Sequence, residues 1–210
     1  MQELRIYTDA QDRAPFEEWL QDLKDRKGRA VIRARLERVR AGNFGDCKPL
    51  RDGVQELRID HGPGYRVFLS RQGPVTVLLL CGSDKGGQDR AIRQAICVPD
   101  RLEATTITMT AARDKSYSDS LTAALTDPEE AAAYLDAVID MEDPAALVTA
   151  LRRVAAAHGM AEVARRTSLG DKTLFRSLGD NGNPTLATLQ KVLHAVGLRL
   201  SVQPAETPTA

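Results

Sequence analysis

Apolar and polar residues alternate in four short stretches of the first hundred residues, and this spacing predicts β-strands. Between the first two stretches, apolar residues recur every three or four positions. This recurrence predicts two helices, one beginning at Pro15 and one following Gly28. A short helix at 91–96 ends this part of the chain, so the expected order is β-α-α-β-β-β-α. The predicted strands are residues 3–7, two strands within residues 48–69, and residues 75–81.

The pattern changes after residue 100. Residues 101–118 are rich in Thr and Ala and have no sustained period, so we expect a linker there. From 119 to 204 the chain is rich in alanine, and its apolar residues recur at helical spacing. The dipeptides Asp127-Pro128 and Asp143-Pro144 mark two helix starts, with Asp as the cap and Pro in the first turn.

Two further features are predicted at the C-terminal end. Residues 198–203 alternate and predict a short strand, and residues 205–210 are expected to form a disordered tail. The predicted fold class is therefore α+β. A β-α-α-β-β-β-α domain with a small antiparallel sheet occupies residues 1–100, and an all-α domain with a short terminal strand occupies residues 119–204.

Basic residues fall at strand spacing along the predicted hairpin of residues 48–69, whose turn is Gly62-Pro63-Gly64. Side chains two residues apart point to the same face of a strand, so these cations are expected to converge on one concave surface. Such a surface favours a polyanion. The converging residues are Lys48, Arg51, Arg58 and Arg66.

Residues 160–178 read as two short helices around a four-residue turn, the arrangement that places a second helix in the DNA major groove. Ser168 is expected to take a left-handed conformation, and Gly170 is a slightly weaker cap than Ser. A helical bundle without DNA binding is the alternative. The predicted DNA-binding residues are Ser168, Asp171, Lys172, Thr173 and Arg176, although the charge of Asp171 opposes a phosphate.

The charge of the 210-residue chain is zero overall but is unevenly distributed. Residues 1–104 carry 19 basic against 16 acidic side chains, and residues 105–210 carry 10 against 13. Opposite charges favour association of the two halves, although an imbalance of three charges also arises by chance.

The three cysteines, Cys47, Cys81 and Cys97, form no CxxC pattern, so we expect reduced thiols and no metal site. The N-terminus is strand-like rather than a signal peptide, and no apolar run reaches membrane-spanning length. The expectation is a cytoplasmic protein without a membrane partner or a cofactor.

A dense set of short motifs in residues 1–98 resembles the RelE/ParE superfamily of toxins, and within it the HigB-like addiction module killer proteins. The motifs are Arg35-Leu-Glu-Arg38, Gly42-Asn-Phe-Gly-Asp46, Lys48-Pro-Leu-Arg51, Gly53-Val-Gln-Glu-Leu-Arg-Ile59, Gly62-Pro-Gly-Tyr-Arg-Val67 and Leu78–Lys85. This resemblance implies cleavage of mRNA on the ribosome. Some branches of the superfamily poison gyrase instead.

Residues 121–203 resemble the HigA-like antidote proteins of the same modules, which have a Cro/lambda-repressor-type helix-turn-helix. The matching motifs are Leu121–Asp127, Ala131–Leu135, Met160–Thr167, Asn183–Leu186 and Gly197–Val202. The resemblance implies a toxin partner and an operator DNA.

RNA cleavage by its own 2′-hydroxyl needs a base, an acid and donors that stabilise a pentavalent phosphate. Arginines provide fork-shaped donors, and either lysine is a candidate acid or base. The candidate catalytic residues are Lys48, Arg58, Arg66 and Lys85. The candidate RNA-binding residues are Arg51, His61 and Tyr65, although Tyr65 alternates to the face opposite Arg66 and is alternatively a core residue.

The leading hypothesis is a type II toxin–antitoxin module in one chain. The antidote half would cover the basic cleft of the toxin half, within one chain or between two, and would repress its own operator as a homodimer. The alternative is a DNA-binding regulator with an inactive toxin-like domain, and a gyrase inhibitor is a third option. Nuclease activity therefore stays open at this stage.

Overall fold

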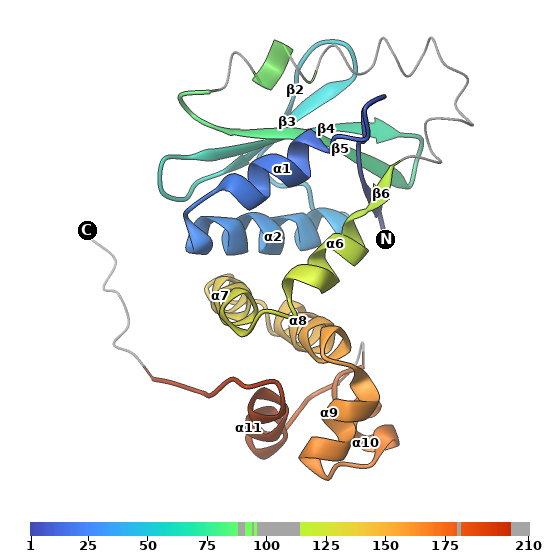
Figure 1. Cartoon of the computed structure of the whole chain (residues 1–210), viewed down its shortest axis with the longest axis vertical. Helices are drawn as coiled ribbons and strands as arrows, with labels where there is room; N and C mark the ends of the chain where they lie inside the picture. Colours follow the sequence, from blue (N-terminus) through green and yellow to red (C-terminus); the bar gives the residue numbers. More distant parts are fainter. Residues whose placement is uncertain (88–90, 94, 96–113, 180–181, 203–210) are drawn as a thin grey trace.

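The computed structural model describes residues 1–87, 91–93, 95, 114–179 and 182–202. The sheet lies at one end, and helices α1 and α2 cross one of its faces. The helices of the C-terminal part follow on the far side of α2 (Figure 1). The elements of the N-terminal part are β1 (Glu3–Ile6), α1 (Pro15–Asp22), α2 (Arg26–Arg40), β2 (Cys47–Pro49), β3 (Val54–Ile59), β4 (Tyr65–Gln72) and β5 (Thr76–Asp84).

Six strands form one mixed sheet in the order β2-β3-β4-β5-β1-β6. The two strands predicted within residues 48–69 are present as β3 and β4, the strand predicted at 75–81 is present as β5, and β2 is an additional short strand. Asp52 and Gly53 adopt positive φ angles and turn β2 back onto β3. The expectation of an antiparallel sheet is wrong for one pair: β1 inserts beside β5 and runs parallel to it. The two helices that follow β1 supply the crossover that parallel neighbours need.

The two faces of the sheet carry different side chains. Residues such as Leu57, Val67 and Leu79 pack against α1 and α2. On the other face, Phe68 and Leu80 form a second cluster with Ala91 and Ala95, which are helical. The strand alternation therefore separates a helix-covered face from a second face that carries the predicted cations.

The sheet extends beyond the first hundred residues. Strand β6 (Lys115–Ser116) pairs antiparallel with β1, and helix α6 (Tyr117–Ala124) follows at once. A strand and the start of a helix therefore occupy residues 115–118 of the stretch 101–118 that was expected to be a linker. Residues 101–113 of that stretch lie outside the described residues.

The C-terminal part consists of helices joined by short turns. After α6 come α7 (Pro128–Ile139), α8 (Pro144–Ala157), α9 (Met160–Thr167), α10 (Asp171–Ser177) and α11 (Leu186–Ala195). Asp127 and Asp143 cap α7 and α8, as predicted, since each carboxylate accepts hydrogen bonds from two backbone N–H groups.

The predicted C-terminal strand is absent from residues 198–202, and Gln203 and the predicted tail at 205–210 lie outside the described residues. The neighbouring elements of this segment are helices, which offer no strand edge for pairing. Leu200 is 41% exposed and Val202 is 98% exposed.

One apolar core joins the two parts of the chain. Small residues of α2, including Ala30 and Ala34, belong to the same cluster as Ala131 and Ala137 of α7. Small side chains allow helices to pack closely, so α7 lies directly on α2. In the part of the chain that the structure describes, no helix combines the length and apolarity needed to cross a lipid bilayer.

Candidate nucleic-acid interfaces

Three of the predicted cations share one face of the sheet. Lys48 stands opposite Glu56 in the β2–β3 register, and Arg58 stands opposite Arg66 in the β3–β4 register. Glu56 and Arg58 are two residues apart on one strand, so all four side chains lie on the face away from α1 and α2. The predicted convergence of Lys48, Arg58 and Arg66 therefore holds in the strand registers.

Sequence reasoning did not select Glu56, the acidic residue at the centre of this group. Its side chain is 1% exposed. The Nε of Arg58 donates to Glu56 Oε2 at 2.8 Å, and the Nη2 of Arg58 lies 2.8 Å from the same oxygen. The Nε of Arg66 lies 2.8 Å from Oε1. One buried carboxylate thus contacts both candidate phosphate-binding arginines.

Lys85 and Arg51 occupy different ends of the sheet. Lys85 is exposed and directly follows β5, where Ser83 pairs with Arg66. Arg51 lies in the turn before β3. The strand from its first residue, Val54, to Arg58 is about 13 Å long. The Arg51 side chain is 73% exposed and lies 3.9 Å from Asp52. The fold therefore keeps Lys85 near the arginine pair and places Arg51 apart from it.

His61 and Tyr65 belong to the opposite, helix-covered side. The Tyr65 hydroxyl donates to Asp25 Oδ2 at 2.8 Å, and its ring packs edge-on against Trp19. His61 Nε2 lies 4.0 Å from the same Asp25 carboxylate, which caps α2. Desolvation, followed by the hydrogen bond to Asp25, raises the pKa of Tyr65 to about 12. Tyr65 is 3% exposed, so its ring packs in the core, as the alternative interpretation expects.

The cysteine thiols are free at the two described positions. Cys47 is half-buried and Cys81 is buried, and burial raises the pKa of the Cys81 thiol to about 12. Among the residues with described positions, no three His, Cys, Asp or Glu side chains form a metal-binding group. Cys97 lies outside the described residues.

The helix-turn-helix geometry is present at α9 and α10. Ser168 ends α9 in the left-handed region with φ 54° and ψ 23°, as predicted, and Gly170 caps α10 without a side-chain hydrogen bond. Leu174 is buried and fixes the inner face of α10. The exposed positions of α10 are Lys172, Thr173, Phe175 and Arg176. Asp171 begins the helix.

Phe175 was not among the predicted DNA-binding residues, yet its side chain is 58% exposed. An exposed aromatic ring beside Thr173 and Arg176 is suited to apolar contact with the methyl group of thymine. The sequence pattern assigned Phe175 to neither face of the helix, and the orientation of α10 in the structure shows that its ring is exposed.

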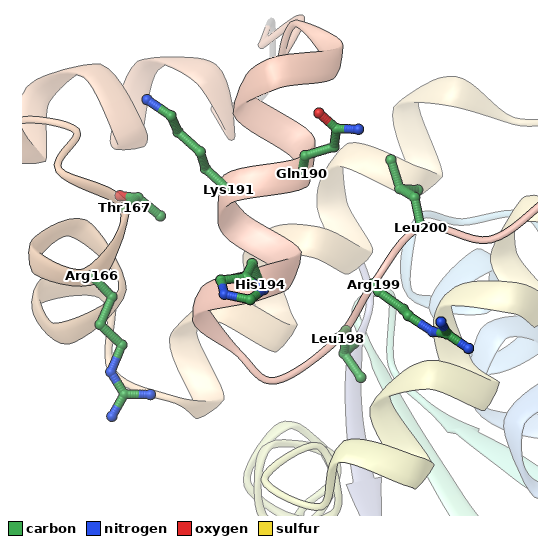
Figure 2. A pocket seen from close by; sticks show the side chains of 8 residues that line it. All are labelled: Arg166, Thr167, Gln190, Lys191, His194, Leu198, Arg199 and Leu200. Atoms are coloured by element: carbon green, nitrogen blue, oxygen red, sulfur yellow. The ribbon is translucent and has the colours of Figure 1, made fainter.

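A groove of about 520 Å³ lies beside α11 and the segment that follows it (Figure 2). Four of its lining residues are basic or titratable: Arg166, Lys191, His194 and Arg199. Arg166 lies in the last turn of α9 and donates to the Ala195 carbonyl at 3.1 Å, and His194 lies in the last turn of α11. The guanidinium of Arg166 complements the negative C-terminal end of α9, so Arg166 has a structural role in the groove without a ligand.

The densest ionic contact in the structure joins α7 to α2. Glu130 accepts from Arg29 and Arg33 and lies 3.7 Å from the Nε of Arg26. The Glu130 side chain is 13% exposed, and Arg29 and Arg33 are 15% and 8% exposed. Burial alone would raise the pKa of Glu130, but the hydrogen bonds from Arg29 and Arg33 outweigh it and lower the pKa. Glu129 also pairs with Arg26, in an exposed position.

Further contacts extend this interface along α1 and α2. The Nε of Arg153 in α8 lies 2.8 Å from Glu37 Oε2 in α2. Lys115 Nζ and Ser120 Oγ contact the Glu17 carboxylate of α1 at 2.9 Å and 2.8 Å. The buried Tyr117 hydroxyl donates to the Arg33 carbonyl at 3.5 Å.

The C-terminal part therefore packs on the helix side of the N-terminal part. Within one chain, the described C-terminal residues do not cover the cationic sheet face, because the contacts above go to α1 and α2 while Arg58 and Arg66 lie on the opposite face. The reason is the composition of α2. One side of this helix packs on the sheet, and its outer side offers both small residues and the arginines that pair with Glu130. Covering of the cationic face by a second chain stays a prediction.

Comparisons with known proteins concern the C-terminal part. Residues 117–204 match the family described as probable addiction module antidote protein. An uncharacterized protein of Haemophilus influenzae is 54% identical over 87 residues, which cover 41% of this chain and 88% of that protein. A second uncharacterized protein of the same organism is 34% identical over 79 residues, 38% of this chain and 81% of its own length. No solved structure matches the chain significantly.

Proposed function

This chain belongs, through its residues 117–204, to the family of probable addiction module antidote proteins, and from that premise we propose that it is a toxin and its antidote in one polypeptide. The antidote domain is residues 117–202 of the described chain. The toxin is the α+β domain formed by β1 to β5 with α1 and α2. The single observation that supports this division best is the arginine cluster of α2 that holds Glu130 of the antidote domain.

The toxin reaction that we propose is endonucleolytic cleavage of mRNA on the ribosome. A 2′-oxygen that has lost its proton attacks the adjacent phosphorus, and the 5′-oxygen leaves with a proton. Arg58 and Arg66 would bind the phosphate whose charge grows in the pentavalent state. Lys48 and Lys85 are exposed cations near this pair and would supply the acid or base. His61 lies on the other face of the sheet, so it takes no part in this step.

Inhibition in this proposal does not require the antidote domain to touch the arginines. The domain adds its helices on the outer side of α1 and α2, and the enlarged particle no longer fits a ribosomal site sized for the toxin domain. Because both domains belong to one chain, their effective concentration is high and the toxin is silent by default.

Reversing the charge of Glu130 tests the proposal in the full-length chain. A Glu130→Lys side chain would face three arginines in a mostly buried position, and breaking a buried pair in this way costs about 3 kcal/mol or more. We expect expression of this variant to arrest growth and to produce cleaved mRNA. The Glu129→Lys variant is the matched control, because its side chain is 67% exposed and should leave docking and growth unchanged.

A second substitution separates nuclease activity from general toxicity. Adding Arg66→Ala to Glu130→Lys should restore growth and intact mRNA while docking stays broken. The nuclease proposal fails if the Glu130→Lys chain is folded, has lost docking by limited proteolysis, and leaves mRNA intact. In that result, a regulator with an inactive toxin-like domain becomes the better description. Altered DNA supercoiling before mRNA loss would point to gyrase.

We also propose that the antidote domain binds the operator of its own gene through α10, as a homodimer. The exposed Lys172, Thr173 and Arg176 support this role. With a DNA fragment from upstream of the gene, Arg176→Ala should weaken binding about tenfold, the effect of losing one good base or phosphate contact. Arg199→Ala removes an equally exposed cation outside the helix-turn-helix and should change binding less than twofold. Equal losses in both variants would contradict the assignment.

A further inference from the structure

Two arginines stand directly opposite each other on β3 and β4, an arrangement that is unfavourable for isolated like charges. The side chain of Arg58 is 36% exposed and that of Arg66 is 14% exposed, so water screens their repulsion only in part. The structure offsets this repulsion with a single carboxylate, Glu56, which occupies the next position on the same face.

The carboxylate divides its two oxygens between the two guanidinium groups. Oε2 contacts both the Nε and the Nη2 of Arg58, whereas Oε1 contacts the Nε of Arg66. The charge-assisted hydrogen bond from Arg58 and the ion pair with Arg66 restrict the rotation of the two side chains. Each guanidinium still has N–H donors that these contacts do not use, since five donors are available per arginine.

We propose that Glu56 is the positioning residue that orients Arg58 and Arg66 toward the RNA phosphate. This inference rests on the proposed function of the sheet face. With both oxygens occupied by guanidinium groups, Glu56 is a poor acceptor for the 2′-hydroxyl proton, and so it acts through the arginines rather than on the substrate. The group of three keeps a net charge of +1 for an incoming phosphate.

The direction in which a Glu56 substitution changes RNA affinity distinguishes positioning of the arginines from simple charge balance. Replacing Glu56 by Gln removes a negative charge from a cationic face, and on charge alone this must strengthen RNA binding. If Glu56 orients the arginines, the same change weakens binding, because preorganised donors lose their geometry. The probe is a short single-stranded RNA with 2′-O-methyl riboses, which lacks the attacking hydroxyl. Binding is measured on the full-length chain by fluorescence anisotropy.

We expect Glu56→Gln to weaken binding about tenfold, as Arg66→Ala does. Glu56→Asp keeps the charge but withdraws the carboxylate by one methylene, and it should also weaken binding. Asp52→Asn removes an exposed charge from the turn before β3, at the end of the sheet away from the arginine pair, and should change binding less than twofold. Arginine Nε–H signals in NMR spectra provide the second readout: those of Arg58 and Arg66 should shift and broaden in Glu56→Gln while the backbone amide spectrum is preserved.

Each result decides between the proposals. Equal or tighter binding by Glu56→Gln, or by Glu56→Asp if the first variant does not fold, overturns the role of Glu56 alone. If the wild-type chain binds the probe no better than Arg66→Ala does, the sheet face is not an RNA site. That result overturns the proposed nuclease and the inference with it.

Discussion

At the residue scale, the backbone conformation of Ser168 lowers the stability of the helix-turn-helix. Its φ of 54° lies in the left-handed region, where an L-residue other than glycine loses about 1 kcal/mol. Ser168 is exposed, so a smaller side chain leaves no cavity. We therefore expect Ser168→Gly to stabilise the chain by about 0.5–1 kcal/mol in urea unfolding followed by circular dichroism, and Ser168→Val to destabilise it by at least as much. Lower stability of the glycine variant would contradict this account.

The same scale shows what the sequence predicts and what it leaves open. The strand period of two placed Lys48, Arg58 and Arg66 on one face, and that placement holds. The same period also puts Glu56 on this face, but the sequence pattern alone indicates a solvent-exposed side chain for an acidic residue in a strand. Only the burial of its carboxylate reveals that it belongs to the site. His61 and Tyr65 follow the same hairpin, and their contacts with Asp25 depend on how α2 crosses the sheet.

At the element scale, β2, β6 and α6 are elements that the sequence did not predict. A two-residue strand has too few positions to show alternation, and its pairing partner β1 lies more than a hundred residues earlier. The helices of the antidote domain were more predictable, because caps such as Asp127 and Asp143 act within one turn. The docking of α7 on α2 was predictable only in part. The sequence shows the arginines along one side of α2, but such a side equally fits a helix face exposed to solvent.

Tyr117 is a side chain that attaches α6 to the N-terminal domain. It is 2% exposed and belongs to the core shared by both parts of the chain. We expect Tyr117→Ala to destabilise the full-length chain by about 3–5 kcal/mol, the range for a large aromatic side chain replaced in a core. Tyr117→Phe should cost less than about 1 kcal/mol, since the hydrogen bond to the Arg33 carbonyl is long at 3.5 Å. Urea unfolding measures both, and similar losses in the two variants would show that the hydroxyl, not the ring, holds α6.

At the scale of the whole molecule, the interface between the two domains should depend on pH through Glu130, which faces Arg26, Arg29 and Arg33. The pKa of Glu130 is lowered from its ordinary value of 4.5, because the hydrogen bonds from Arg29 and Arg33 outweigh desolvation. A lowered pKa means that the ion pairs stabilise docking fully above pH 4.5 and that this stabilisation is lost as the pH falls through the native value. Glu17, whose pKa is also lowered, changes docking in the same direction.

The measurement that isolates Glu130 is the free energy of unfolding of the wild-type chain minus that of Glu130→Gln, followed from pH 7 to pH 3. At pH 7 the variant should be about 3 kcal/mol less stable, because Arg29 and Arg33 keep their charges in a mostly buried site without a partner. The difference should shrink below pH 4.5, where the wild-type carboxylate gains a proton. Glu129→Gln should stay close to wild type throughout, since its pair with Arg26 is exposed. A difference that is independent of pH would mean that Glu130 stabilises docking by packing rather than by charge, and the ionic account of the contact between α7 and α2 would then be wrong.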